Sequence, residues 1–150
     1  MNIAIAYASM YGTTTSVAQE LKQYLKQKNI AVDLLDVMET NPDNLTSYDL
    51  IFFGVSTYGD GELNPVAEDF FAKTKEIAHT CNHTKFAIFA LGDKAYPQFA
   101  KSGELTQEIL ESMNAQVITP ILTIEASPFD EAIRKTKTWA DEIISQVTPI

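Results

Sequence analysis

The sequence predicts an α/β protein in which helices cover both faces of an open, doubly wound parallel sheet. Short apolar runs alternate along all 150 residues with segments whose apolar residues recur every three or four positions, as strands alternate with helices. The segment 49–56 is almost continuously apolar, which is typical of a central parallel strand covered on both faces. A chain of this length fits one domain, so we expect residues 1–150 to form a single domain.

Five segments have the pattern of strands. Ile30, Val32 and Leu34 alternate with less apolar residues, which predicts a strand with one covered face. The other segments are more uniformly apolar and are predicted to be buried strands. The five predicted strands are 3–8, 30–37, 49–56, 85–91 and 116–124.

Four segments between and after these strands have helical periodicity. The segment 13–28 gathers its apolar residues on one face, and a helix is also expected near 103–114. Asn64 is placed to cap a helix that starts at Pro65. The last helix follows Pro128, and its buried stripe is predicted to hold Phe129, Ile133, Thr136, Ala140, Ile143 and Val147.

The chain is acidic, with 20 acidic and 11 basic residues and a formal charge of −9. Nucleic-acid binding needs clustered basic residues, which the sequence lacks, whereas an acidic surface attracts basic proteins or simply aids solubility. Cys81 is the only cysteine, which excludes an intramolecular disulfide and suits a reducing compartment. No apolar run is long enough to cross a bilayer and no signal peptide is evident, so we expect a cytoplasmic monomer without a membrane partner.

Ligands of such sheets bind beyond the carboxyl ends of the strands, where the strand order reverses. The loop after the first strand is Ser9-Met10-Tyr11-Gly12-Thr13-Thr14. Its hydroxyls, its glycine and its consecutive N–H groups stand at the positive end of a helix dipole, which is the chemistry of a phosphate site. The first basic residue after the loop is Lys22, so N–H and O–H donors alone would hold the phosphate. The same threonines would also serve as ordinary helix caps.

The loops after the third and fourth strands both combine tyrosine with glycine. The earlier loop is Ser56-Thr57-Tyr58-Gly59-Asp60-Gly61, whose glycines let the backbone approach a flat ligand. The later loop begins at Leu91-Gly92-Asp93 and carries Tyr96 and Phe99. Either loop would alternatively be a plain turn with its aromatic residues packed beneath it, and packing is the role we favour for Phe99. Taken with the first loop, they predict a site for a flat aromatic ring attached to a phosphate.

Other functional sites fit the sequence poorly. The first loop lacks the lysine of a P-loop and the additional glycines of a Rossmann fingerprint. A receiver domain needs acidic residues at the ends of the first and third strands, where this chain has Ala8-Ser9 and Val55-Ser56. The run His79-x-Cys81-x-His83 lacks an obvious fourth ligand, so no metal site is expected. No nucleophile–base pair is evident, and we assign no catalytic residue.

With these motifs the sequence resembles the flavodoxin family over essentially its whole length. It is most similar to the small MioC-type flavodoxins and to the FMN domains of diflavin reductases. The matching segments are 9–14, S-T-Y-G-D-G-E at 56–62 and L-G-D-K-A-Y-P-Q-F at 91–99, in the family's order and spacing. About thirteen residues separate Asn114 from Pro128, which leaves no room for the insertion of long-chain flavodoxins. The resemblance implies a short-chain flavodoxin whose strands are ordered 2-1-3-4-5.

The resemblance also implies FMN as the cofactor and a role for each loop. The phosphate would be held by Ser9, Gly12, Thr13 and Thr14. The isoalloxazine would be flanked by Tyr58 and Tyr96, and its polar edge lined by Thr57, Gly59, Asp60, Gly92 and Asp93. The remaining candidates for the cofactor site are Met10, Tyr11, Ser56, Gly61, Leu91 and Phe99. Tyr11 departs from the family, because many flavodoxins have a phosphate-binding threonine at that position.

By the same resemblance the protein is an electron carrier and not an enzyme. It would receive electrons from an NAD(P)H-dependent flavoprotein reductase and pass them singly to an iron–sulfur or haem enzyme. Two alternatives stay open. One is a flavin-dependent reductase that acts directly on a small substrate, although the sequence has no basic pocket for a nicotinamide. The other is a flavin-free interaction module. The two loop tyrosines count against this alternative, and Tyr11, which replaces a phosphate-binding threonine, counts in its favour.

Overall fold

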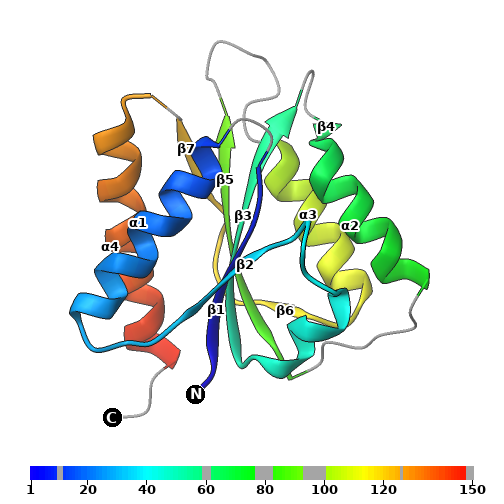
Figure 1. Cartoon of the computed structure of the whole chain (residues 1–150), viewed down its shortest axis with the longest axis horizontal. Coiled ribbons are helices and arrows are strands. Elements are labelled where there is room, and N and C mark those ends of the chain that lie inside the picture. Colours follow the sequence, from blue (N-terminus) through cyan, green and yellow to red (C-terminus); the bar gives the residue numbers. More distant parts are fainter. Residues whose placement is uncertain (10–11, 59–61, 77–82, 93–100, 126, 148–150) are drawn as a thin grey trace.

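The computed structural model describes residues 1–9, 12–58, 62–76, 83–92, 101–125 and 127–147, which form a layered α/β fold (Figure 1). The parallel strands of its central sheet are ordered β2-β1-β3-β5-β6, and β7 continues the edge beside β5. A short strand β4 pairs antiparallel with the end of β3. The predicted order 2-1-3-4-5 is confirmed, since β6 and β7 share the fifth place. The strand bounds are β1 Ile3–Ala8, β2 Asp33–Asp36, β3 Leu50–Tyr58, β4 Glu62–Leu63, β5 Lys85–Gly92, β6 Gln116–Val117 and β7 Leu122–Glu125.

Helices cover both faces of the sheet, as Figure 1 shows. One face carries α1 (Thr13–Gln27) and α4 (Phe129–Val147). The other carries α2 (Pro65–Glu76), α3 (Lys101–Ser112) and the short 3₁₀ helix η1 (Pro42–Ser47). The expected N-cap of α2 is confirmed, because the Ala67 N–H donates to Asn64 Oδ1 at 2.9 Å.

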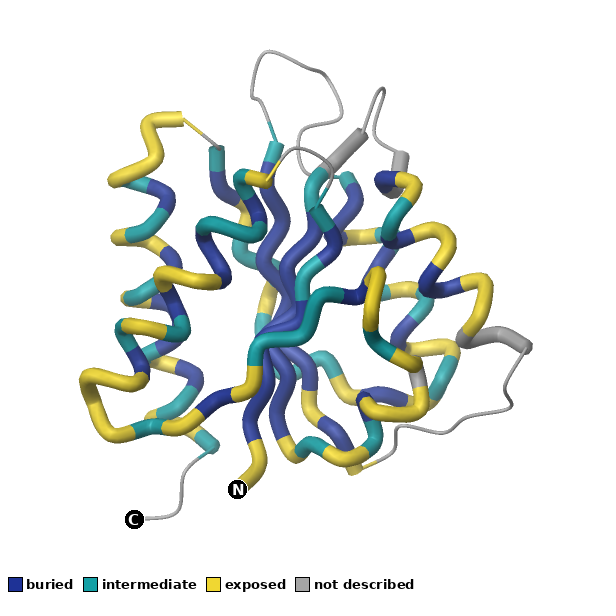
Figure 2. Tube along the Cα trace, in the orientation of Figure 1, coloured by how far each residue is buried: buried dark blue, intermediate teal, exposed yellow. Residues whose placement is uncertain are grey.

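The central strands are buried along most of their length (Figure 2). The alternation of side chains along these strands splits the core into two layers. On β1, the small residues Ala4, Ala6 and Ala8 face α2 and α3. Their size leaves room there for large rings such as Phe53, which stacks on Phe71 with 5.6 Å between ring centroids. On the opposite face, Trp139 packs edge-on against rings from β3 and β5.

A polar cluster joins the two helices of the α1–α4 layer. The Tyr24 hydroxyl donates to Asp141 Oδ2 at 2.5 Å, and Lys28 Nζ donates to Asp141 Oδ1 at 2.8 Å. Burial opposes ionisation of Asp141, but these hydrogen bonds outweigh it and hold the pKa of the carboxyl below its usual value. The cluster therefore fixes one helix against the other with a charge at its centre.

Three details differ from the sequence predictions. The fifth strand is interrupted at Pro120, which has no N–H to offer β5. Val117 pairs with Phe86 of β5, and Leu122 pairs with Phe89 of β5. The edge segment therefore uses five residue steps between these two pairs, whereas β5 uses three. The second strand is shorter than 30–37 and spans only β2. Phe129 is 38% exposed and so lies outside the buried stripe predicted for α4, because it begins the helix ahead of Ala132, the first residue of α4 in the buried core.

The start of the chain and the end of α4 lie at the amino edge of the sheet. Met1 and Val147 line one hollow together with residues that begin β3 and β5, among them Leu50 and Lys85. Among the helices in the described part of the chain, none combines the length and the hydropathy that a bilayer crossing requires.

Candidate functional site

The candidate site lies at the carboxyl edge of the sheet, where β1, β3 and β5 end beside one another. The chain leaves β1 toward β2 on one side and then crosses to β3 on the other, so the strand order reverses between β1 and β3. Open α/β sheets bind ligands outside such a switch point. The three loops predicted from the sequence all leave this edge.

The first loop ends in a glycine that begins α1. Gly12 is the N-cap residue with φ +88° and ψ −11°, a left-handed conformation that favours glycine. Its N–H donates to Ser9 Oγ at 3.0 Å, and its carbonyl accepts from Ser16 Oγ at 3.0 Å. Apart from those of Gly12 and its chain neighbours, no atom of the described residues lies within 4 Å of the position where its Cβ would stand, and the first helical turn contains no acidic residue. The positive end of the α1 dipole is therefore accessible to an anion.

Thr14 provides an independent sign of a ligand at this loop. It is 1% exposed, and its Oγ1 finds no hydrogen-bond partner within the described parts of the chain. Leaving a buried hydroxyl without a partner is costly, and native structures contain few such groups. The residues at the start of α1 thus fit a phosphate group, since they combine a first helical turn that has no side-chain cap with a hydroxyl that lacks a partner among the described residues.

The second loop leaves the end of β3 and returns through β4. Thr57 and Tyr58 belong to β3, where they pair with Leu63 and Glu62 of β4. Ser56 is half-buried, and its Oγ accepts from Asn64 Nδ2 at 3.1 Å. The backbone of the predicted ring-binding segment is therefore tied to the sheet on both sides of residues 59–61.

The third loop follows the end of β5. Leu91 is buried in the α1–α4 layer and pairs with Ile124, whereas Gly92 is half-buried and pairs with Glu125. The Leu91 side chain is therefore part of the core. Any contact that this residue makes at the candidate site would come from its backbone. The predicted site residues that lie outside the described part of the chain are Met10, Tyr11, Gly59, Asp60, Gly61, Asp93, Tyr96 and Phe99.

Asn64 is a residue of the site that the sequence pattern did not reveal as more than a helix cap. Its side chain is fully buried, and its Nδ2 donates to Ala8 O at 3.0 Å and to Ser56 O at 3.2 Å. It thus joins the last residue of β1, which precedes the first loop, to the strand that leads into the second loop. Ala8 lies 56 residues away in the sequence and Ser56 lies 8 residues away across the second loop, so the helix-capping pattern offers no signal for these contacts.

Acidic side chains lie one strand away from the first loop, near the end of β2. Burial, with Asp36 and Glu39 nearby, raises the pKa of Tyr7 on β1. Tyr7 is consequently neutral at physiological pH.

Among the described residues, no group of three His, Cys, Asp or Glu side chains could hold a metal ion. His79 and Cys81 of the candidate metal run lie outside these residues.

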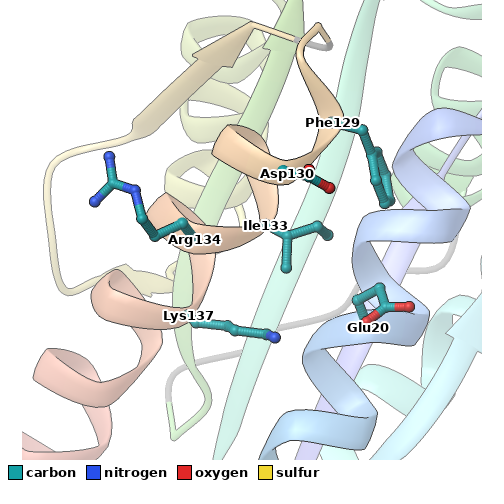
Figure 3. A pocket seen from close by; sticks show the side chains of 6 residues that line it. All are labelled: Glu20, Phe129, Asp130, Ile133, Arg134 and Lys137. Atoms are coloured by element: carbon teal, nitrogen blue, oxygen red, sulfur yellow. The ribbon is translucent and has the colours of Figure 1, made fainter.

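A separate hollow of about 430 Å³ lies between α1 and α4 (Figure 3). Phe129 and Ile133 provide its apolar lining, and charges of both signs surround it. Arg134 at its rim is paired with Glu131 on the same helix. Its described lining residues, none of which belongs to the predicted loops, are Glu20, Phe129, Asp130, Ile133, Arg134 and Lys137.

Comparisons with known proteins agree with this architecture. The sequence model of the family described as Flavodoxin matches residues 5–139. The protein named "Probable flavodoxin 1" of Bacillus subtilis is 36% identical over 137 residues, covering 91% of this chain and 85% of that protein. The structure of oxidised flavodoxin 2 from Bacillus cereus is 34% identical with a TM-score of 0.86, covering 97% of this chain and 99% of that one.

A longer relative matches through one segment. The NADPH sulfite reductase flavoprotein alpha-component of Shewanella oneidensis is 26% identical over 150 residues, which make up 99% of this chain but 24% of that protein. The expected resemblance to flavodoxins and to the FMN domains of diflavin reductases is confirmed. This chain of 150 residues belongs to the flavodoxin family, whose members bind FMN and carry electrons.

Proposed function

We propose that this flavodoxin receives electrons from an NAD(P)H-dependent flavoprotein reductase and passes them one at a time to an iron–sulfur or haem enzyme. Residues 1–150 would act as one FMN-binding domain in the cytoplasm, as a monomer. The three loops at the carboxyl edge of the sheet would hold the cofactor at the switch point between β1 and β3.

The observation that carries this proposal is the unpartnered Thr14 hydroxyl beside the open start of α1. Thr14 Oγ1 is buried and lacks a partner among the described residues, and Gly12 leaves the helix N-terminus uncovered. We assign the FMN phosphate to this loop, with Ser9, Gly12, Thr13 and Thr14 as its donors. No basic residue stands in the loop, so neutral donors and the helix dipole would balance the phosphate charge.

The other two loops would hold the ring. Tyr58 and Tyr96 are proposed to flank the isoalloxazine, and the backbone of Thr57, Gly59, Asp60, Gly92 and Asp93 to line its polar edge. Met10, Tyr11, Ser56, Gly61, Leu91 and Phe99 would complete the surroundings. The pairing of β3 with β4 supports this placement, because it anchors the segment around Tyr58 to the sheet.

When bound, FMN supplies a ring that takes up and releases electrons singly. The protein's part is to bind the phosphate, orient the ring and limit its contact with water. Those tasks need well-placed hydrogen-bond donors and rigid walls, and they need no nucleophile or general base. The absence of such a pair from the sequence motifs is consistent with a carrier.

Charge supports the proposed partners. At −9, the protein would be steered toward basic surfaces on a reductase or an acceptor. The sulfite reductase relative is named as an NADPH flavoprotein, which supports an NADPH-dependent donor for this chain as well.

The test is reduction of the FMN-loaded protein. The visible spectrum should show bound-flavin bands, and stepwise dithionite titration should resolve two one-electron steps. A purified NADPH-dependent flavoprotein reductase should then reduce it, and the reduced protein should in turn reduce a haem acceptor. Failure to bind FMN would favour the flavin-free interaction module. Direct and rapid oxidation of NADPH without any reductase would favour the alternative of a reductase acting on small substrates.

A further inference from the structure

Asn64 makes more hydrogen bonds than a helix cap requires. Its Oδ1 accepts from Ala67 N, which is the capping hydrogen bond of α2. Its amide nitrogen donates in the opposite direction, to Ala8 O at 3.0 Å, Ser56 O at 3.2 Å and Ser56 Oγ at 3.1 Å. Serine or aspartate would cap the helix as well, but neither would offer this NH₂ group.

The orientation of the Asn64 amide follows from its partners. The Ala67 N–H is a donor and must face the oxygen, while the carbonyls of Ala8 and Ser56 are acceptors and must face the nitrogen. The side chain is fully buried, so water does not compete for these groups. One rigid amide therefore holds three backbone segments: the end of β1, the end of β3 and the start of α2.

Two of these segments lead into the proposed cofactor loops. Ala8 directly precedes Ser9 of the phosphate loop, and Ser56 directly precedes the segment proposed to contact the ring. The bonds between Ser56 and Asn64 also close the base of the segment 57–63, which turns back through β4. Resting on the proposed function, we infer that Asn64 is a positioning residue that sets the distance between the phosphate loop and the first ring loop.

The hydrogen bonds of Asn64 form a tie between the two loops. The loss of this tie should weaken the binding of a ligand that spans both loops more than the binding of a ligand that touches only one loop. FMN joins a phosphate to a ring through a chain of limited length, so both ends fit only when the loops are correctly spaced. Riboflavin has the same ring and lacks the phosphate. Loss of the tie should therefore weaken FMN binding strongly and riboflavin binding much less, whereas a general loss of structure would weaken both equally.

The experiment compares Asn64→Asp and Asn64→Ser with the wild-type protein. Both variants keep an oxygen that can accept from Ala67 N, and both remove the NH₂ donor. Thr84→Val is the matched control, because Thr84 is also fully buried and donates to Tyr48 O at 2.9 Å, but at the amino end of β5. For each protein, flavin fluorescence gives the Kd for FMN and for riboflavin, and the fluorescence of Trp139 during urea unfolding gives the stability of the apoprotein.

We expect either Asn64 variant to raise the Kd for FMN at least about tenfold, and the Kd for riboflavin by no more than about threefold. Thr84→Val should lower stability while leaving the ratio of the two Kd values unchanged. A second readout is the separation of the two one-electron potentials of bound FMN, which should change in the Asn64 variants and not in Thr84→Val.

If the Asn64 variants raised the Kd for FMN and the Kd for riboflavin by the same factor, or changed neither Kd, the positioning role would be overturned. The proposed function would stay intact. A wild-type protein that binds neither flavin would overturn the proposed function, and the role of Asn64 with it. Refolded Asn64→Ser that binds FMN as tightly as wild type would likewise count against the tie.

Discussion

The ring of Phe89 occupies the space that a side chain on Gly54 would need. The two residues pair across the neighbouring strands β3 and β5, and a Cβ built on Gly54 would stand 2.3 Å from Phe89 Cζ. Phe89 in turn packs edge-on against Trp139, with 5.9 Å between ring centroids. The missing side chain of Gly54 therefore permits the aromatic packing of the α1–α4 layer.

Gly54→Ala should destabilise the protein by about 2–3 kcal/mol, because the new methyl group must displace a buried ring. Urea unfolding followed by Trp139 fluorescence measures the loss. The double variant Gly54→Ala/Phe89→Leu makes room for the methyl group and should be more stable than the sum of the two single changes predicts. If the losses of stability of the two single variants simply added up in the double variant, the clash with Phe89 would not be the cause of the destabilisation by Gly54→Ala.

Thr14→Val should separate stability from cofactor binding. Removing this buried hydroxyl, which has no partner in the described part of the chain, should stabilise the apoprotein by about 1 kcal/mol. The same change should weaken FMN binding by about tenfold or more, because a donor to the phosphate is lost. Fluorescence titration with FMN and urea unfolding of the apoprotein measure the two effects.

Thr106→Val is the matched control for that experiment. Thr106 Oγ1 is also buried without a partner among the described residues, but it lies on α3 and belongs to none of the proposed loops. Its replacement should stabilise the protein to a similar extent and leave the Kd for FMN unchanged. If both variants weakened FMN binding alike, Thr14 would have no special role toward the phosphate.

Tyr48 should be among the last tyrosines to ionise. Its hydroxyl donates to Asp33 Oδ2 at 2.7 Å, and burial together with this hydrogen bond raises its pKa to about 12 from an ordinary 10.0. A raised pKa contributes stability that is full below about pH 10 and is lost as the pH rises through about 12. Ultraviolet titration of tyrosinate should therefore show a late step, and Tyr48→Phe should remove both that step and its share of the alkaline loss of stability.

Salt should slow electron transfer to basic partners. A protein of charge −9 attracts a basic haem protein such as cytochrome c over a distance that ions screen. Between about 50 mM and 500 mM sodium chloride, the second-order rate of cytochrome c reduction by the reduced protein should fall about tenfold or more. Stopped-flow absorbance measures the rate, and a rate independent of salt would exclude electrostatic steering.

Local patterns in the sequence predicted most of the fold correctly. The covered strand β3, the start of α1 and the cap at Asn64 each follow from residues close together in the chain, where periodicity and helix capping act. The break at Pro120 was missed because the apolar residues around it continue on both sides. Pairing with β5, which the proline interrupts, is a property of the partner strand as well.

The candidate site could be predicted from the sequence only in part. The positions of the loops follow from the order of the strands, and the hydroxyls of the first loop are evident in the sequence. The lack of a partner for Thr14 Oγ1 among the described residues and the amide bridge of Asn64 both depend on the three-dimensional arrangement of the chain. Phe129 fits the helical stripe by spacing, yet it precedes the part of α4 that meets the sheet, so periodicity alone misplaced it.

The hollow shared by Met1 and Val147 has a consequence for joining this protein to another domain. Both residues lie at the amino edge of the sheet, and β3 alone is 9 residues long, or about 30 Å, so the proposed cofactor loops lie roughly that far away. A partner fused through either residue would start at the edge of the sheet opposite the proposed cofactor loops. Even fully extended, a linker needs about ten residues to span about 30 Å, and a flexible linker reaches a typical span of about 30 Å only at about 30 residues.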